Sequence, residues 1–118
     1  MQYSSQNLYK KLLGAAGETQ AVKYLQKQGC KIIKRNYTTP LGEADIVMQE
    51  GEDTVFVEVK TRTTDAFSTP GSAVDYKKQK RYRDIAKLYF LKMGEEVNVR
   101  FDVVEITQNG VNWIKNAF

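Results

Sequence analysis

The sequence predicts a single α/β domain, residues 1–118, in which a mixed central β-sheet is flanked by helices. One helical pattern precedes three strand-like segments, a second helical pattern follows them, and two more strand-like segments close the chain. A length of 118 residues suits one domain with one hydrophobic core, and the chain contains no linker, repeat or low-complexity segment.

Residues 5–28 are expected to form the first helix, because apolar residues recur at spacings of three and four and Gly29 follows as a stop. Gly14 and Gly17 would let this helix approach the sheet closely. Glu18 falls inside the apolar stripe, where a carboxylate needs a counter-ion, a hydrogen bond or a bound cation. Periodicity leaves open whether Glu18 forms a structural ion pair or belongs to a site. The stripe consists of Leu8, Leu12, Ala15, Val22 and Leu25.

Three strands are expected after the first helix. In residues 31–38, the apolar pair Ile32 and Ile33 is followed by polar residues, and residues 39–42 have the composition of a turn. Residues 42–48 and 54–62 are rich in Val, Ile and Phe, and Gly51 lies in the polar gap between them. A gap of this kind is typical of a hairpin, so we expect the second and third strands to pair antiparallel.

The second helix is expected to run from about residue 73 to residue 93. Ser72 and Asp75 resemble the two ends of a capping box, and Gly94 is a typical helix stop. Its predicted apolar face consists of Val74, Tyr82, Ile85, Ala86, Tyr89 and Met93.

Two strands are expected at the end of the chain. Residues 97–107 alternate between apolar and polar, Asn109-Gly110 is a strong hairpin signal, and residues 111–114 form the closing strand. Trp113 is expected to pack at the edge of the sheet. Asp102 lies within an apolar strand, and we interpret it as a buried, hydrogen-bonded carboxylate with a structural role.

The composition excludes several kinds of chemistry. The absence of histidine rules out a Ser-His-Asp triad, a histidine-ligated zinc and a histidine-metal nuclease. The single cysteine, Cys30, excludes an intrachain disulfide and a multi-cysteine zinc site, and its sequence context favours a small buried hydrophobe. Catalysis would therefore rest on carboxylates, lysines and a metal. No apolar run is long enough to span a membrane, and the first seven residues lack signal-peptide features, so we expect a cytoplasmic protein.

The third predicted strand carries the strongest candidate site. Side chains alternate along a strand, so Glu58 and Lys60 share one face, and an antiparallel hairpin would bring Asp45 beside Glu58. Two carboxylates can bind a hard divalent cation, and a lysine can lie beside the attacking water. The alternative for Glu58 and Lys60 is a plain surface ion pair, which contributes little to stability.

The second helix carries a dense set of basic residues within a chain of net charge +4. We interpret this surface as one that follows nucleic-acid phosphates, although charged helix faces are commonly only solvated. Arg62, in the polar loop after the third strand, would also reach a phosphate, or would be a mobile surface residue. The basic residues of the helix are Lys77, Lys78, Lys80, Arg81, Arg83 and Lys87.

Asp45, followed after twelve residues by Glu58-Val59-Lys60, resembles the Asp…(Asp/Glu)-x-Lys core of the PD-(D/E)xK nuclease superfamily, although Ala44 stands where the superfamily name has Pro. Further segments, covering nearly the whole chain, resemble the small bacterial YraN-like family, described as endonucleases similar to archaeal Holliday-junction resolvases. These segments are Gly17-Glu18-x-x-Ala21-x-x-Tyr24-Leu25, Arg35-Asn36-Tyr37, Gly42-Glu43-Ala44-Asp45-Ile46, Phe56-Val57-Glu58-Val59-Lys60-Thr61-Arg62, Lys78-Gln79-x-Arg81, Arg100-Phe101-Asp102-Val103-Val104 and Asn116-Ala117-Phe118.

The resemblance implies a restriction-endonuclease-like core and metal-dependent cleavage of nucleic acid, with DNA, including branched DNA, as the expected partner. It makes Glu18 a third acidic ligand, beside Asp45, Glu58 and the Val59 carbonyl, for Mg²⁺ or Mn²⁺. Lys60 would orient or deprotonate the attacking water. Lys78 and Gln79, at the edges of the apolar stripe of the second helix, would turn towards the site and orient substrate or water. The alternative is a non-catalytic DNA- or RNA-binding accessory protein with the same fold. Paired cuts at a junction would be simplest for a weak or substrate-induced homodimer, for which Trp113 and Phe118 are apolar candidates.

Overall fold

The computed structural model describes residues 5–63, 67, 74–94 and 98–118. The order of elements confirms the predicted α/β fold, with one helix, three strands, a second helix and two strands. These elements are α1 (Ser5–Lys27), β1 (Lys31–Thr39), β2 (Gly42–Glu50), β3 (Asp53–Thr61), α2 (Tyr76–Met93), β4 (Asn98–Thr107) and β5 (Gly110–Ile114).

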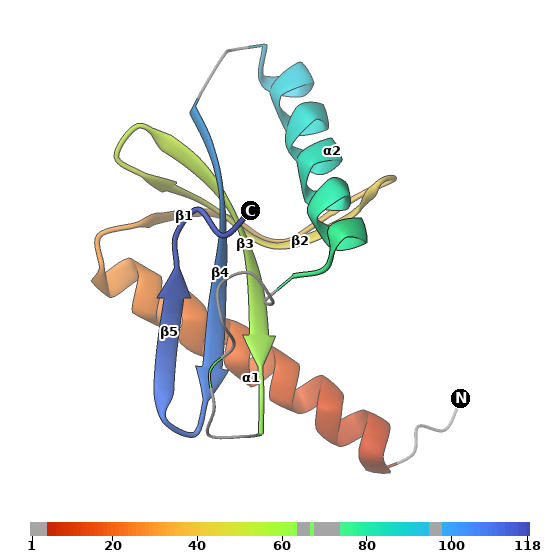
Figure 1. Ribbon diagram of the computed structural model, residues 1–118, viewed down its shortest axis with the longest axis vertical. Helices are drawn as coiled ribbons and strands as arrows, with labels where there is room; N and C mark the ends of the chain where they lie inside the picture. The colour runs from red at the N-terminus through yellow and green to blue at the C-terminus, as the bar shows by residue number, and fades with distance from the viewer. Residues whose placement is uncertain (1–4, 64–66, 68–73, 95–97) are drawn as a thin grey trace.

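The strands form one mixed sheet in the order β1-β2-β3-β4-β5 (Figure 1). Neighbouring strands pair antiparallel, except that β3 and β4 are parallel, with α2 in the connection between them. The β2–β3 hairpin turns at Gly51 and the β4–β5 hairpin turns immediately before Gly110, as the sequence predicts. Both glycines have positive φ, a conformation that glycine adopts without strain.

The two helices cover opposite faces of the sheet, because alternate residues of β3 join different hydrophobic clusters. Val55 and Val57 pack in the cluster that contains Leu25 of α1. Phe56 packs in the other cluster, whose members from α2 include Tyr82, Ile85, Ala86 and Tyr89. These four residues confirm most of the predicted apolar face of α2. The site residues of β3 therefore have α1 behind the sheet and α2 in front of it.

Three of the five residues of the predicted apolar stripe of α1 are exposed. Val22 and Leu25 lie in the core, but Ala15 is exposed, and Leu8 and Leu12 are 50% and 61% exposed. Figure 1 shows the reason, since the N-terminal half of α1 extends beyond the sheet. Only the half that crosses the strands has a surface against which to bury its apolar residues.

Gly17 marks a close approach of α1 to the sheet. A Cβ atom added there would lie 1.9 Å from the side-chain oxygen of Thr61 in β3, whereas one added at Gly14 would meet nothing within 4 Å. The expected close packing is thus confirmed for Gly17 and wrong for Gly14.

The start of α2 differs from the prediction. The helix begins at Tyr76 instead of residue 73, because Asp75 itself is the N-cap and accepts a hydrogen bond from the Lys78 amide at 2.9 Å. Ser72 lies outside the described residues. The end of the helix is as predicted, since Gly94 adopts the left-handed conformation with φ of 69°. Met93 is 55% exposed and does not belong to the buried face.

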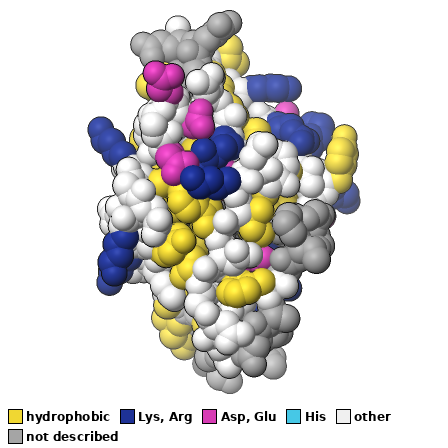
Figure 2. Space-filling model, turned by 60° about the vertical axis from the view of Figure 1, so that its left-hand side comes forward, with side chains coloured by type: hydrophobic (Ala, Val, Ile, Leu, Met, Phe, Trp, Pro, Cys, Tyr) yellow, Lys and Arg dark blue, Asp and Glu magenta, His cyan; other side chains and the backbone are white. Residues whose placement is uncertain are grey.

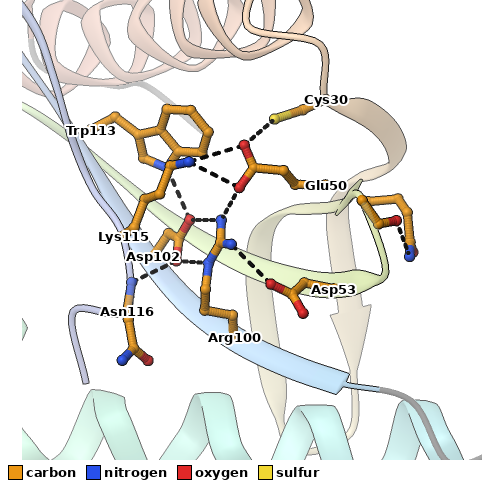
Figure 3. Close-up of polar contacts among 10 residues, drawn as sticks. Cys30, Glu50, Asp53, Arg100, Asp102, Trp113, Lys115 and Asn116 are labelled. Carbon is orange, nitrogen blue, oxygen red and sulfur yellow. Dashed lines mark hydrogen bonds and ion pairs between the residues drawn. The ribbon is translucent and has the colours of Figure 1, made fainter.

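Asp102 has the structural role expected from its position. Its carboxylate is fully buried and accepts hydrogen bonds from three directions (Figure 3). Arg100 donates two bonds of 2.8 and 2.9 Å, the Trp113 indole one of 2.9 Å, and the Asn116 amide another of 2.9 Å. Arg100 also pairs with Glu50 and Asp53 of the β2–β3 hairpin. The carboxylate therefore fixes β4, β5 and the C-terminal segment to one end of the sheet.

Trp113 and Phe118 both pack within the molecule. Trp113 lies against Tyr24 of α1, and Phe118 stacks on Phe101 and contacts Tyr82. Core packing is thus the better interpretation of the two aromatic residues. Cys30 is buried in the core as predicted, and burial raises the pKa of its thiol.

On the side of the molecule drawn in Figure 2, acidic and basic side chains lie next to one another, with hydrophobic side chains below them. Charges that pair within the molecule in this way leave little net field for a polyanion. Within the described part of the chain, no helix is long and apolar enough to cross a membrane.

Candidate functional site

The candidate site forms where β2 separates from β3. The pairing of these strands runs from Glu50 opposite Asp53 to Ile46 opposite Val57. Asp45, the residue before Ile46, continues the contact with β3 through its side chain. Its carboxylate accepts a hydrogen bond of 2.8 Å from the backbone amide of Val59. Figure 1 shows the β1–β2 hairpin turning away from β3 towards α2. The Asp45 side chain thus takes the place of a backbone carbonyl of β2 as the acceptor for the Val59 amide. This hydrogen bond holds the Asp45 carboxylate against the edge of β3.

Helix α2 supplies the partners of Glu58. The side chain of Glu58 is 8% exposed, and its Oε1 lies 2.5 Å from Nζ of Lys78. The Tyr82 hydroxyl donates a hydrogen bond of 2.6 Å to its Oε2 and accepts one of 3.2 Å from the Asp45 amide. Tyr82 therefore joins the two acidic residues through one oxygen atom.

Tyr82 is a site residue that sequence reasoning missed, because its spacing assigned it to the apolar face of α2. The available signal was its hydroxyl group, since a buried tyrosine usually needs a hydrogen-bond partner. Burial and the charges of Glu58 and Asp45 raise the pKa of Tyr82. The hydroxyl therefore remains protonated and acts as a donor to Glu58.

Burial and the neighbouring charge of Glu58 act on Asp45. Burial, followed by the charge of Glu58, raises the pKa of Asp45 to about 7, although the hydrogen bond from Val59 opposes the shift. Glu18 contributes a smaller repulsion, so its charge also acts on Asp45. A buried acidic pair of this kind holds a proton up to neutral pH unless a cation balances the charge.

Glu18 approaches the same region from α1. Its side chain is 12% exposed, and its Oε1 lies 3.6 Å from Nε of Arg35. That oxygen is buried and has no hydrogen-bond partner among the described residues. Both interpretations of Glu18 from the sequence therefore retain support. The contact with Arg35 supports a structural ion pair, and the effect of Glu18 on the pKa of Asp45 supports a site residue. In the side-chain arrangement of the described residues, no three Asp, Glu, Cys or His groups are gathered closely enough to hold a metal ion.

A family model described as "Uncharacterised protein family UPF0102" matches residues 17–106. The chain belongs to this family. A UPF0102 protein of Alkaliphilus oremlandii is 45% identical over 115 residues, which cover 92% of this chain and 98% of the relative. A UPF0102 protein of Thermodesulfovibrio yellowstonii is 41% identical, over 90% of this chain and 95% of the relative. A UPF0102 protein of Caldicellulosiruptor saccharolyticus is 43% identical, over 92% of this chain and 98% of the relative. The matched range contains the whole candidate site.

In this UPF0102 protein, Lys60 and Gln79 lie at the border of the site. Lys60 is half-buried, follows Glu58 on the same face of β3, and stands opposite Glu105 in the parallel ladder with β4. The side-chain amide of Gln79 donates a hydrogen bond of 3.0 Å to the carbonyl of Val74. Gln79 thereby fixes the segment that leads into α2, a contact that its spacing did not indicate.

The predicted basic residues have three different surroundings. Lys78 points into the site, whereas Arg62 forms an ion pair of 3.2 Å with the buried carboxylate of Glu105. Lys80 pairs with Asp84 at 2.9 Å on the exposed surface of α2. The remaining side chains are exposed on α2, and they are Lys77, Arg81, Arg83 and Lys87. Sequence reasoning thus missed Glu105, which holds the Arg62 guanidinium that was expected to meet a phosphate.

Proposed function

We propose that this UPF0102 protein is a metal-dependent endonuclease of the PD-(D/E)xK kind, related to YraN-like proteins. It hydrolyses phosphodiester bonds of nucleic acid, DNA in particular, in the cytoplasm. The observation that carries the proposal is the convergence of Asp45 and Glu58 at the point where β2 separates from β3. Acidic residues so placed at the end of a sheet can bind a hard cation and face a substrate outside the strands.

Asp45, Glu58 and the Val59 carbonyl supply hard oxygen atoms of the kind that a divalent cation binds, and Glu18 would have to move closer to complete the set, because the described side chains gather no three acidic groups around one point. Burial and then the charge of Glu58 raise the pKa of Asp45, and the buried Oε1 of Glu18 has Arg35 at 3.6 Å but no hydrogen-bond partner among the described residues. A cation would remedy both, because it replaces the shared proton and gives the oxygen a partner. Glu18, Asp45, Glu58 and the Val59 carbonyl would hold Mg²⁺ or Mn²⁺, which supplies positive charge against the phosphate oxygens.

The other site residues have roles that follow from their positions. Lys60 shares the face of β3 with Glu58, so its ammonium group would hold the attacking water and assist its deprotonation. Gln79, anchored to Val74 through its amide nitrogen, would orient substrate or water through its oxygen. Tyr82 keeps Glu58 and the backbone of Asp45 in register.

The exposed basic residues of α2 would bind the phosphate backbone. Such contacts provide affinity without sequence preference and make binding depend strongly on salt. Arg62 would join them only by leaving Glu105. Branched DNA such as a four-way junction is the first substrate to test, and two paired cuts there would come from a weak homodimer that forms on the substrate.

The ion pair between Lys78 and Glu58 favours a second candidate function. A lysine already balances one of the acidic residues, so the fold could serve as a non-catalytic nucleic-acid-binding protein. Cleavage separates the two candidates.

The decisive experiment incubates purified protein with Mg²⁺ or Mn²⁺ and labelled four-way junctions, flaps, duplexes, single strands and RNA. The endonuclease proposal expects cleavage of at least one substrate, lost on addition of a chelator and in Asp45→Asn and Glu58→Gln, which keep the side-chain volumes. Tight binding of nucleic acid without cleavage under any of these conditions would establish the accessory protein instead.

A further inference from the structure

Lys78 differs from the exposed basic residues of α2 because its ammonium group lies against Glu58 inside the candidate site. Its backbone is fixed, since its amide donates to the N-cap Asp75 at 2.9 Å. Its side chain is still 37% exposed, so the four-carbon stem has solvent on one side. Lys78 therefore combines an anchored backbone with a side chain that is partly open to solvent and paired with Glu58 at its end.

The two oxygens of Glu58 are divided between two partners of unequal mobility. Oε2 is held by Tyr82, which is 1% exposed and packed in the core. Oε1 is held by Lys78, the more exposed of the two. A divalent cation between Asp45 and Glu58 would lie within a few ångströms of the ammonium group, and like charges so close repel strongly in a partly buried site. Of the two partners, Lys78 is the one that can leave.

We propose that Lys78 is an exchangeable counter-cation of Glu58, displaced by a divalent cation and then taken up by a nucleic-acid phosphate. The inference rests on the proposed function, which supplies the divalent cation and the phosphate. The neighbouring Lys77 and Arg81 are exposed on the same part of α2, so a phosphate bound there would come within reach of Lys78. The divalent cation then frees Lys78 from Glu58 for the phosphate, and the phosphate draws Lys78 away from the place of the cation. By linkage, each ligand raises the affinity of the protein for the other by the same factor.

The test compares wild type with Lys78→Gln, which keeps most of the stem and removes the charge. Lys92→Gln, on the exposed last turn of the same helix, is the matched control. Without nucleic acid, calorimetry should give a Kd for Mn²⁺ that is roughly two- to fivefold smaller in Lys78→Gln, the range of a partly exposed ion pair. Lys92→Gln should match wild type. If Lys78 merely supported the site, Lys78→Gln would bind Mn²⁺ more weakly than wild type. Tighter Mn²⁺ binding by the variant therefore identifies Lys78 as a competitor of the cation.

A second measurement reports on the metal-free protein. Removal of the counter-cation should lower the Tm of Lys78→Gln by about 4 °C, and saturating Mn²⁺ should raise its Tm by more than that of wild type. A phosphorothioate duplex, which resists hydrolysis, then tests the coupling. Mn²⁺ should tighten duplex binding to wild type by a larger factor than to Lys78→Gln.

The outcomes separate this inference from the proposed function. Equal or weaker Mn²⁺ binding by folded Lys78→Gln overturns the exchange, while Mn²⁺ binding and cleavage by wild type still support the endonuclease. A lower Tm of Lys78→Gln with no Mn²⁺ binding by either protein would make Lys78 a permanent counter-ion, which overturns both the exchange and the metal site.

Discussion

The amide of Val59 donates its hydrogen bond to the Asp45 carboxylate, 2.8 Å away, at the point where the backbone ladder between β2 and β3 gives way to a side chain. This relationship fixes the carboxylate by a group that cannot rotate away. The position of Asp45 is therefore set by the sheet, and its charge is set by burial and by Glu58.

The first prediction concerns the pH dependence of stability in the presence of a chelator. The pKa of Asp45 rises from 3.8 to about 7 on folding. A group whose pKa is higher in the folded state stabilises the fold fully below about pH 4 and loses that contribution as the pH rises through about 7. Asp45→Asn keeps the acceptor for Val59 and removes the charge, so it should be more stable than wild type at pH 8, by on the order of 1–3 kcal/mol.

Urea denaturation from pH 4 to pH 8.5 measures this difference directly. The advantage of Asp45→Asn over wild type should vanish near pH 4 and grow as the pH rises. A difference that stays constant over the whole range would show that Asp45 is ionised at every pH tested. Saturating Mn²⁺ should stabilise wild type and leave Asp45→Asn nearly unchanged.

The second prediction is that Tyr82→Phe destabilises the fold by about 1–3 kcal/mol. The change leaves the Asp45 amide without its acceptor and Oε2 of Glu58 without its donor, while the aromatic ring is kept. Denaturation of Tyr76→Phe provides the control, since Tyr76 is 74% exposed on the same helix and should tolerate the loss of its hydroxyl. Equal stabilities of the two variants would remove Tyr82 from its proposed bridging role.

The third prediction contrasts two glycines of α1. Gly17→Ala places a Cβ atom 1.9 Å from the Thr61 side chain and should cost about 1–3 kcal/mol, because α1 must move away from β3. Gly14→Ala meets no atom within 4 Å and should stabilise the helix by up to about 1 kcal/mol. Thr61→Ala should restore part of the stability of Gly17→Ala. Stabilisation by both alanines would contradict the close approach at Gly17.

The fourth prediction separates chemistry from affinity. Lys60→Ala should abolish cleavage and change DNA affinity only slightly, because Lys60 is expected beside the attacking water. Lys80→Ala combined with Arg83→Ala should weaken binding to every DNA sequence and reduce the slope of log K against log salt by roughly one to two. Binding at several salt concentrations and single-turnover cleavage measure the two effects. Full cleavage by Lys60→Ala would exclude its proposed role.

Local rules predicted most of the fold. Alternation along β3 predicted that Glu58 faces away from Val57, and the glycines of the turns and of the α2 terminus lie where expected. The error in the stripe of α1 arises because periodicity does not say how far a neighbouring element extends, whereas the start of α2 was wrong because Asp75 itself is the N-cap. Leu12 fits the stripe of α1 and is exposed because the sheet ends before it.

The site was predictable only in part. Spacing within one hairpin brought Asp45 and Glu58 together, because hairpin register is a local property. The contacts of Glu58 with Lys78 and Tyr82 depend on how α2 crosses the sheet, 20 or more residues further along the chain. The pairing of Arg62 with Glu105 depends likewise on β4. No local pattern specifies such distances between elements.

The parallel pairing of β3 with β4 also determines when the site can assemble during folding. Strands β1, β2 and β3 are joined by tight turns and can pair early, since closing short loops loses little chain entropy. β4 must join β3 across the long connection that contains α2, which is a slow, non-local step. Because α2 lies in that connection, a growing chain carries both acidic residues well before it carries the helix that joins them, and newly made protein completes its site only when α2 has docked on the sheet.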